Sequence, residues 1–172
     1  MGININIYNA LLFQIAWLAC VVGGDQVAPY VAAMVVLLHL RYVSGDTHEI
    51  LLLLQILLLG IAVDSAFLFS GLLIGNSVLS VPPFWLASLW LVFATTLLHS
   101  LAFFQRYRSI APLVGFVSGA LSYKAGTSLS DIGLAEPQWF SLFAIGLVWS
   151  VIFPLCLRLA QYHAQKFEIA KG

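Results

Sequence analysis

Charged residues are scarce in this chain. Only 8% of its 172 residues are Asp, Glu, Lys or Arg, whereas about a quarter of the residues in a soluble protein are charged. Hydrophobic residues make up 62% of the chain, and its mean hydropathy is +1.01. This composition is typical of an integral membrane protein, and no polar stretch is long enough for a separate soluble domain. We therefore expect a single transmembrane domain over residues 1–172.

The motifs of several well-known activities are also absent. The sequence contains no H-E-x-x-H zinc motif, no phosphate-binding glycine loop, no nucleophile elbow and no basic patch for nucleic acid. The only two cysteines, Cys20 and Cys156, are predicted near opposite membrane faces, too far apart for a disulfide. We therefore leave catalytic residues unknown and assign no cofactor, no metal ion and no nucleic-acid partner.

Six apolar segments approach or exceed the roughly 20 residues that a helix needs to cross a membrane. They are residues 8–23, 27–43, 49–74, 83–104, 110–123 and 137–159. Gly, Pro, Asn and Asp residues between them mark turns. The pattern predicts an all-α bundle of six transmembrane helices. Five helices plus a short or broken fifth segment are the alternative, because that segment reaches Lys124 after about 14 residues.

The distribution of Lys and Arg predicts the orientation, because cytoplasmic loops of membrane proteins are enriched in these residues. With both termini in the cytoplasm, the inner segments carry six of the seven basic residues and the outer ones carry only Lys124. The six are Arg41, Arg106, Arg108, Arg158, Lys166 and Lys171. This asymmetry favours an even number of spans with both termini cytoplasmic.

Asp64 lies within the most apolar stretch of the chain, residues 51–75. An isolated charge in hydrocarbon costs several kcal/mol, so the carboxyl must be protonated, paired or facing water. Lys124 is predicted at the same depth and could pair with Asp64, although a lysine can also extend to the membrane surface. A protonated Asp64 would only hold helices together, whereas an ionised one would line a functional site. These alternatives stay open.

The fourth predicted span carries polar residues along one helical face. The residues aligned on this face by steps of three and four are Trp85, Ser88, Val92, Thr95 and His99, of which all but Val92 have polar groups. Thr96 borders this stripe, and in the first span Gln14 and Trp17 form a shorter line that also points inward. Hydrogen bonding between helices explains such lines, and so does a path for a substrate or for protons.

All four histidines, His39, His48, His99 and His163, are predicted in the inner half of the membrane or at its inner surface. Together with Glu49 they offer imidazole and carboxylate ligands, which suit iron or zinc. No paired spacing of a known metal motif supports this site, so we assign no metal ion to it.

Two pairs of glycines have the spacing that lets membrane helices pack closely. Gly71 and Gly75 lie in the third span, and Gly115 and Gly119 lie in the fifth. Small residues four apart allow two helix backbones to approach. We expect them to pack the bundle internally, with a dimer face as the alternative.

Motifs along nearly the whole chain carry a resemblance to a known family. They are Leu12, Phe13 and Gln14 with Trp17 and Cys20, Trp90 with Ala94, Thr95, Thr96, Leu97, His99 and Ser100, Tyr123 with Gly126, and Pro154. In these the chain resembles small bacterial inner-membrane proteins classed as domain of unknown function 2878. The resemblance implies a Gram-negative inner-membrane location. Proteins of this family are associated with neighbouring genes of the cyclopropane-synthase type, so the resemblance also implies a lipid-related role. It assigns no catalytic residue, and Asp64 and Lys124 are not part of the pattern.

We expect a protein that binds or moves a lipid or small apolar molecule, or that assists a membrane lipid-modifying enzyme. The alternatives are a membrane-embedded enzyme, using His99 with Asp64 or a histidine metal site at the rim, and a small proton-coupled transporter. Expected partners are membrane lipids and either another membrane protein or a second copy of this chain. Candidate residues for ligand binding or the polar interior are Gln14, Trp17, Asp64, Trp90, Thr95, Thr96, His99 and Lys124.

Overall fold

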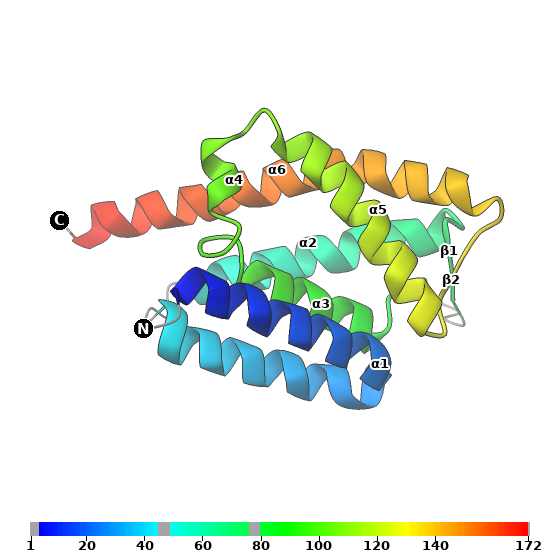
Figure 1. Ribbon diagram of the computed structural model, residues 1–172, viewed down its shortest axis with the longest axis horizontal. Coiled ribbons are helices and arrows are strands. Elements are labelled where there is room, and N and C mark those ends of the chain that lie inside the picture. The colour runs from blue at the N-terminus through cyan, green and yellow to red at the C-terminus, as the bar shows by residue number, and fades with distance from the viewer. Residues whose placement is uncertain (1–3, 45–48, 76–79, 172) are drawn as a thin grey trace.

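The computed structural model describes residues 4–44, 49–75 and 80–171, which are almost entirely helical as predicted (Figure 1). The helices are α1 (Ile5–His39), the π-helical turn η1 (Leu40–Ser44), α2 (Glu49–Phe69), α3 (Phe84–Ala94), α4 (Phe103–Arg106), α5 (Ala111–Leu129) and α6 (Gln138–Lys171). Two short strands, β1 (Leu73–Ile74) and β2 (Gly133–Leu134), pair antiparallel with Leu73 opposite Leu134.

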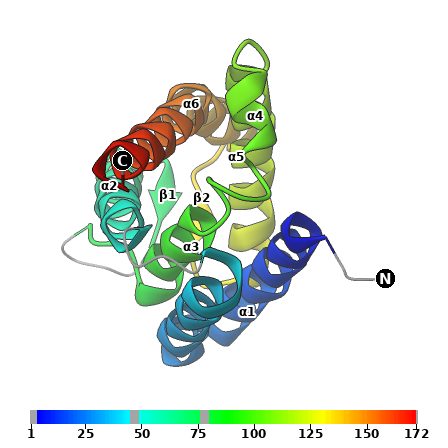
Figure 2. The same ribbon diagram turned by 90° about the vertical axis from the view of Figure 1, so that its left-hand side faces the viewer.

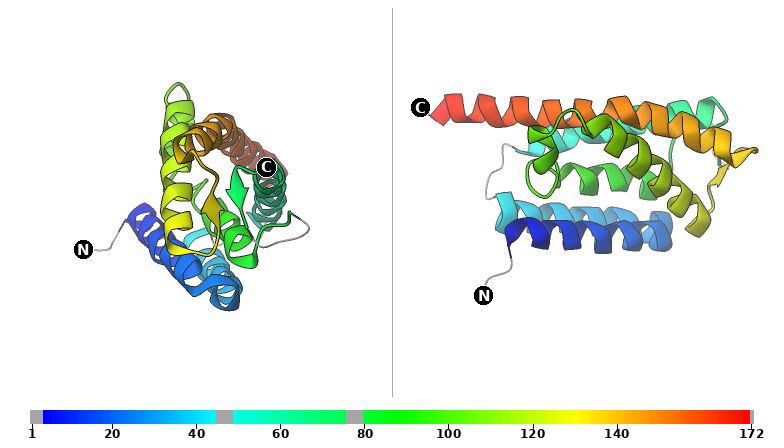
Figure 3. Two further views of the ribbon diagram at one scale, coloured as in Figure 1. Left: turned by 90° about the vertical axis from the view of Figure 1, so that its right-hand side faces the viewer. Right: turned by 45° about the horizontal axis from the view of Figure 1, so that its top comes forward.

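Helix α1 is a hairpin of two antiparallel arms that meet at Gly24 (Figures 1 and 3). Gly24 has φ 58° and ψ −160°, a backbone conformation that residues with a side chain rarely adopt. The arms, residues 5–23 and 25–44 including η1, each have roughly 20 residues and measure about 30 Å. They correspond to the first two predicted segments. Asp25 accepts a hydrogen bond from the backbone N–H of Trp85 at 2.9 Å, which ties the turn to the start of α3.

The fourth predicted segment, residues 83–104, is not one continuous helix. Helix α3 ends at Ala94 after 11 residues, which is about 16 Å and too short to cross the hydrocarbon alone. Residues 95–102 form turns before α4 begins. The hydroxyl of Thr95 donates to the carbonyl of Val92 at 2.7 Å, and such local bonds compete with the regular helical pattern.

Helix α5, the fifth predicted segment, is longer than residues 110–123. It continues past Lys124 to Leu129 and has 19 residues, which corresponds to about 28 Å. The helix itself is therefore unbroken, and the interrupted segment of the bundle is the fourth.

Helix α2 ends earlier than the predicted segment 49–74. Its last residue is Phe69, and Gly71 follows with φ 75°, a conformation common just after a helix end. The chain then enters β1, which includes Leu73 and Ile74. Gly71 and Gly75 therefore lie outside the helix, and their predicted role in helix packing is wrong.

Gly115 and Gly119 pack α5 against α6, as predicted. A Cβ atom on Gly115 would lie 2.4 Å from the backbone oxygen of Trp149, and one on Gly119 would lie 2.3 Å from its side chain. Both distances are shorter than any van der Waals contact. Only glycine at these positions allows the two helices to approach as they do.

Helix α3 lies in the middle of the bundle (Figure 2). It packs against α1 and α2, whereas α5 packs against α6. Trp90 of α3 stacks on Trp149 of α6, with ring centroids 5.0 Å apart. Helices α1 and α5 contact each other only slightly, and the largest contact between the two halves of the bundle is that of α2 with α6.

Large apolar side chains cover the outside of the molecule, among them Ile15, Leu58, Leu113 and Val151. The described chain has three helices long and apolar enough to cross a membrane, over residues 5–44, 49–69 and 138–166. The apolar outer surface suits lipid better than water.

Helix α1 begins and helix α6 ends at the same end of the bundle, and the segments with six of the seven basic residues lie toward that end (Figure 1).

Candidate functional site

Asp64 is fully buried in α2 and is bound by residues of two other helices. Nε1 of Trp90 in α3 donates to its Oδ2 atom at 2.8 Å, and the hydroxyl of Tyr123 in α5 donates to its Oδ1 atom. Gly60 precedes Asp64 by about one turn and makes room for the indole, since a Cβ there would lie 2.0 Å from Trp90. The carboxyl group therefore joins α2, α3 and α5 in the interior.

Lys124 does not pair with Asp64. Its Nζ atom donates to Oε1 of Gln138 at 2.6 Å on the exposed side of α5. Lys124 follows Tyr123 directly, and adjacent residues of a helix point in different directions. Because Tyr123 faces the interior, the lysine faces outward. The two hydrogen bonds to Asp64 thus come from side chains that carry no formal positive charge.

An apolar pocket with a cavity volume of about 70 Å³ lies beside Asp64, and Trp90 and Tyr123 form part of its wall. Its other aromatic wall residues are Phe13, Trp17, Trp85, Phe93 and Trp149. Asp64 itself does not line the pocket. Its carboxyl group accepts hydrogen bonds from two of the wall residues, Trp90 and Tyr123, and so fixes their orientation. Residues from α1, α3, α5 and α6 contribute to this pocket.

A wider groove of about 490 Å³ adjoins the pocket. The two share the wall residues Phe13, Trp17, Phe93, Ser122 and Trp149. Nε1 of Trp17 in α1 donates to Oγ of Ser122 in α5 at 3.2 Å, so one hydrogen bond joins helices that otherwise contact only slightly. Gln14 and Ser118 are exposed and line the groove. Polar groups thus lie in the groove, and the deeper pocket is mainly aromatic.

Asn9 stabilises the non-helical segment 95–102. Its Nδ2 atom donates to the carbonyl of Thr95 at 3.1 Å, and its Oδ1 atom accepts from the hydroxyl of Ser100 at 2.7 Å. Nε2 of Gln105 also donates to the carbonyl of Leu97 at 2.9 Å. Non-helical backbone within a membrane protein is stable only where such partners satisfy its polar groups.

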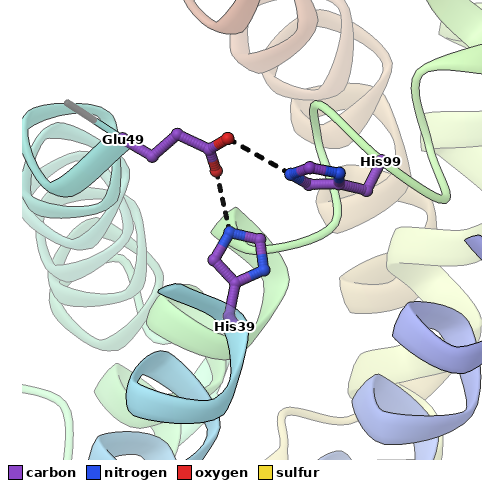
Figure 4. Close-up of side chains that lie close together, drawn as sticks. All are labelled: His39, Glu49 and His99. Carbon is purple, nitrogen blue, oxygen red and sulfur yellow. Dashed lines mark hydrogen bonds and ion pairs between the residues drawn. The ribbon is translucent and has the colours of Figure 1, made fainter. Parts of the chain in front are cut away.

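His39, Glu49 and His99 meet at one end of the bundle (Figure 4). Nε2 of His39 lies 2.8 Å from Oε2 of Glu49, and Nε2 of His99 lies 3.2 Å from Oε1 of the same carboxylate. His39 is fully buried, whereas the side chains of Glu49 and His99 are 15% and 16% exposed. Each residue comes from a different segment: the end of α1, the start of α2 and the turns after α3.

The predicted site residues do not form one site but lie in several separate parts of the structure. Asp64 and Trp90 meet in the interior, and Gln14 and Trp17 line the groove. His99 contacts Glu49, so the proposed pair of His99 with Asp64 is not formed.

Thr95 and Thr96 are buried, and both hydroxyls donate to backbone carbonyls three residues earlier. The predicted polar stripe therefore ends where α3 ends. Among the other histidines, His163 bonds to Gln55 at 2.8 Å, away from this group. His48 lies outside the described residues.

Sequence reasoning did not single out Asn9, although a buried amide in an apolar run is the same signal that drew attention to Asp64. Tyr123 entered only through the family resemblance. Trp149 gave no local signal, because single aromatic residues are common in membrane helices. Its role depends on Gly119 and Trp90, which approach it only in the folded bundle.

The all-helical fold, the apolar outer surface and the hydrogen-bonded interior identify a helical membrane protein. The chain belongs to the family described as "Protein of unknown function (DUF2878)", whose model matches residues 6–155. No curated protein and no solved structure matches the chain. The family description assigns no activity, so the function has to be argued from the site.

Proposed function

We propose that this protein binds the hydrocarbon part of a lipid, or another small apolar molecule, in the groove between α1 and α5 and in the adjoining aromatic pocket beside Asp64. The groove between α1 and α5 would admit the molecule sideways from the bilayer. In this role the protein would present or receive a substrate of a membrane lipid-modifying enzyme. The observation that carries the proposal is a lateral groove of about 490 Å³ that adjoins a smaller aromatic pocket of about 70 Å³.

The size of the groove and the chemistry of the pocket support this function. Binding sites for small molecules usually measure about 300–1,000 Å³ and combine apolar walls with a few polar groups. The groove, at about 490 Å³, lies within this range, and the pocket adds about 70 Å³ of aromatic-walled space. Here aromatic rings form most of the wall. The hydrogen bonds of Trp90 and Tyr123 to Asp64 hold two of those rings in place. A preformed wall lowers the entropy cost of binding, because fewer side chains must be ordered by the ligand.

Trp85 offers a polar contact for the same ligand. Its ring lines the pocket, and its buried Nε1 atom has no hydrogen-bond partner in the described part of the chain. An indole N–H can only donate, and buried donors are nearly always paired. An ester or carbonyl oxygen on an otherwise apolar molecule would supply the acceptor. The expected ligand is therefore a fatty-acyl compound rather than a pure hydrocarbon.

We further propose six membrane passes in the bacterial inner membrane, with both termini in the cytoplasm. The two arms of α1, then α2, then α3 with residues 95–106, then α5 and α6 run successively between the two ends of the bundle (Figure 3). The concentration of Lys and Arg toward the end where α1 begins supports a cytoplasmic location for that end. Reporter fusions after residue 172 and within residues 77–82 should report opposite sides, and the same side for both would contradict this topology.

Ligand binding can be measured on the purified full chain in detergent. Four tryptophans line the pocket, so a fatty acid with bromine on its acyl chain should quench their fluorescence saturably on entering it. Solvent extraction and mass spectrometry of the purified protein should also show acyl lipid in a stoichiometric amount.

A pair of variants on α5 provides the control. Gly126 lines the pocket, and a Cβ there would lie 3.8 Å from Trp85. Gly126→Leu should therefore fill the pocket and weaken saturable quenching at least tenfold, whereas Ala125→Leu, at an exposed position on the same helix, should not change it. Equal quenching of both variants and the wild type would contradict the proposal.

A further inference from the structure

Three side chains of metal-ligating types, from three segments of the chain, meet at the end of the bundle where α1 begins and α6 ends (Figures 1 and 4). One ligating atom each from His39, Glu49 and His99 can be chosen so that all three lie within 4.8 Å of one another. From this geometry we propose that these residues bind one divalent transition-metal ion, Zn²⁺ or Fe²⁺. The proposal is independent of the lipid-binding function, because none of these residues lines the pocket or the groove.

The donor set is the main argument for a metal ion. Two imidazole nitrogens and one carboxylate are typical ligands of zinc and of non-haem ferrous iron. Both histidines present their Nε2 atoms to the same carboxylate, at 2.8 and 3.2 Å. In a tetrahedral site with bonds of about 2.1 Å, ligand atoms lie about 3.4 Å apart. Small side-chain rotations would therefore convert the hydrogen-bonded group into a coordination shell.

Burial at the site favours a bound ion that keeps an open position. His39 is fully buried, while Glu49 and His99 are partly exposed. The protein thus encloses one side of the group and leaves the other open. Water or another small ligand would complete the coordination there, as in metal sites that have three protein ligands.

His39 can rearrange toward a metal ion without losing any other hydrogen bond. Its Nδ1 atom has no partner in the described part of the chain, and its Nε2 atom bonds only to Glu49. The ring of His99 lies edge-on to it, with centroids 4.9 Å apart. Coordination would therefore replace the hydrogen bond of His39 to Glu49 at no cost in other hydrogen bonds of His39.

An ion at this position would connect three segments of the fold. His39 is the last residue of α1, Glu49 is the first of α2, and His99 lies in the turns that follow α3. The backbone bonds of those turns mostly join residues three apart rather than four, and side chains such as Asn9 add further support. Metal binding should therefore stabilise this end of the bundle, since a ligand that binds only the folded state raises its stability.

The test uses the full-length protein purified in detergent with an affinity tag that contains no histidine. After removal of bound metal with a chelator, Zn²⁺ and Fe²⁺ are added separately, the latter without oxygen, and binding is measured against a chromogenic chelator. We expect one equivalent of metal per chain and a higher unfolding temperature with metal. Co²⁺, used as a spectroscopic probe, should give the absorption of a low-coordinate protein site rather than of the hydrated ion.

Glu49→Gln keeps the size and polarity of the side chain but removes a charged ligand. It should weaken metal binding by at least about 100-fold, because even loss of an outer partner of a metal ligand costs 10–100-fold. His163→Ala is the matched control, since His163 bonds to Gln55 outside the group. The proposal would be overturned if the wild type bound no stoichiometric metal, or if wild type and Glu49→Gln bound metal with equal affinity. Either result would mean that His39, Glu49 and His99 only hold the three segments together by hydrogen bonds.

Discussion

Trp90 and Asp64 are joined by a hydrogen bond of 2.8 Å from the indole Nε1 to the carboxyl Oδ2. The indole is part of the pocket wall, whereas the carboxyl lies outside the pocket. Asp64 therefore positions two side chains of the pocket wall, Trp90 and Tyr123, both of which donate hydrogen bonds to its carboxyl group. This relationship gives the buried acidic residue of α2 a structural role, which can be tested by substitution.

Replacement of Asp64 should reduce stability according to how many acceptors it removes. Asp64→Leu leaves the buried donors of Trp90 and Tyr123 unpaired, and we expect it to lower the free energy of unfolding by about 2–5 kcal/mol. Asp64→Asn keeps one acceptor and should cost about 1 kcal/mol. Unfolding in mixed detergent micelles measures both changes. Equal stability of Asp64→Leu and the wild type would show that these hydrogen bonds are not structural.

Asp64 and Lys124 should behave as independent residues. Lys124 bonds to Gln138 on the exposed surface rather than to the carboxyl. In a double-mutant cycle of Asp64→Asn and Lys124→Met, the effects on unfolding should therefore add to within about 0.5 kcal/mol. Recovery of stability in the double variant would reveal an ion pair and contradict the arrangement of α5.

The close packing of α5 on α6 should be sensitive to a single methyl group. In Gly119→Ala the new Cβ would lie 2.3 Å from the Trp149 side chain. We expect a loss of about 1–3 kcal/mol, the usual cost of overpacking. Gly126→Ala on the same helix is the control, because its nearest neighbour, Trp85, is at an ordinary 3.8 Å. A smaller effect at Gly119 than at Gly126 would show that α5 and α6 pack differently.

Asn9 should control the stability of the segment that follows α3. Asn9→Ala removes the hydrogen bonds to Thr95 and Ser100 and leaves buried backbone groups unpaired, at a cost of about 1–3 kcal/mol. Hydrogen exchange of residues 95–102 should accelerate in this variant. Asn6→Ala, at an exposed position on the same helix, should leave exchange unchanged. Unaltered exchange in Asn9→Ala would mean that other contacts hold the segment.

Much of the helical content could be predicted because hydrophobic composition and turn residues are local properties. The arms of α1 follow from apolar runs separated at Gly24 and Asp25, and α6 follows from the run after Pro137. The early end of α3 could not be predicted in the same way. Residues 95–102 mix apolar residues with Thr, His and Ser, and one of the partners that hold their turns, Asn9, is more than 80 residues away in the chain.

In the candidate sites, too, some features could be predicted from the sequence and others could not. The sequence alone indicated a membrane protein, the unusual position of Asp64 and the location of His39, Glu49 and His99 toward one end of the bundle, because these follow from composition and from depth along a helix. Only the tertiary structure decided which side chains meet. It joined Asp64 to Trp90 and Tyr123, excluded Lys124, and brought the histidines to Glu49. Contacts between helices depend on how each helix is rotated and paired, and hydrophobic periodicity in a uniformly apolar chain contains too little information to specify either.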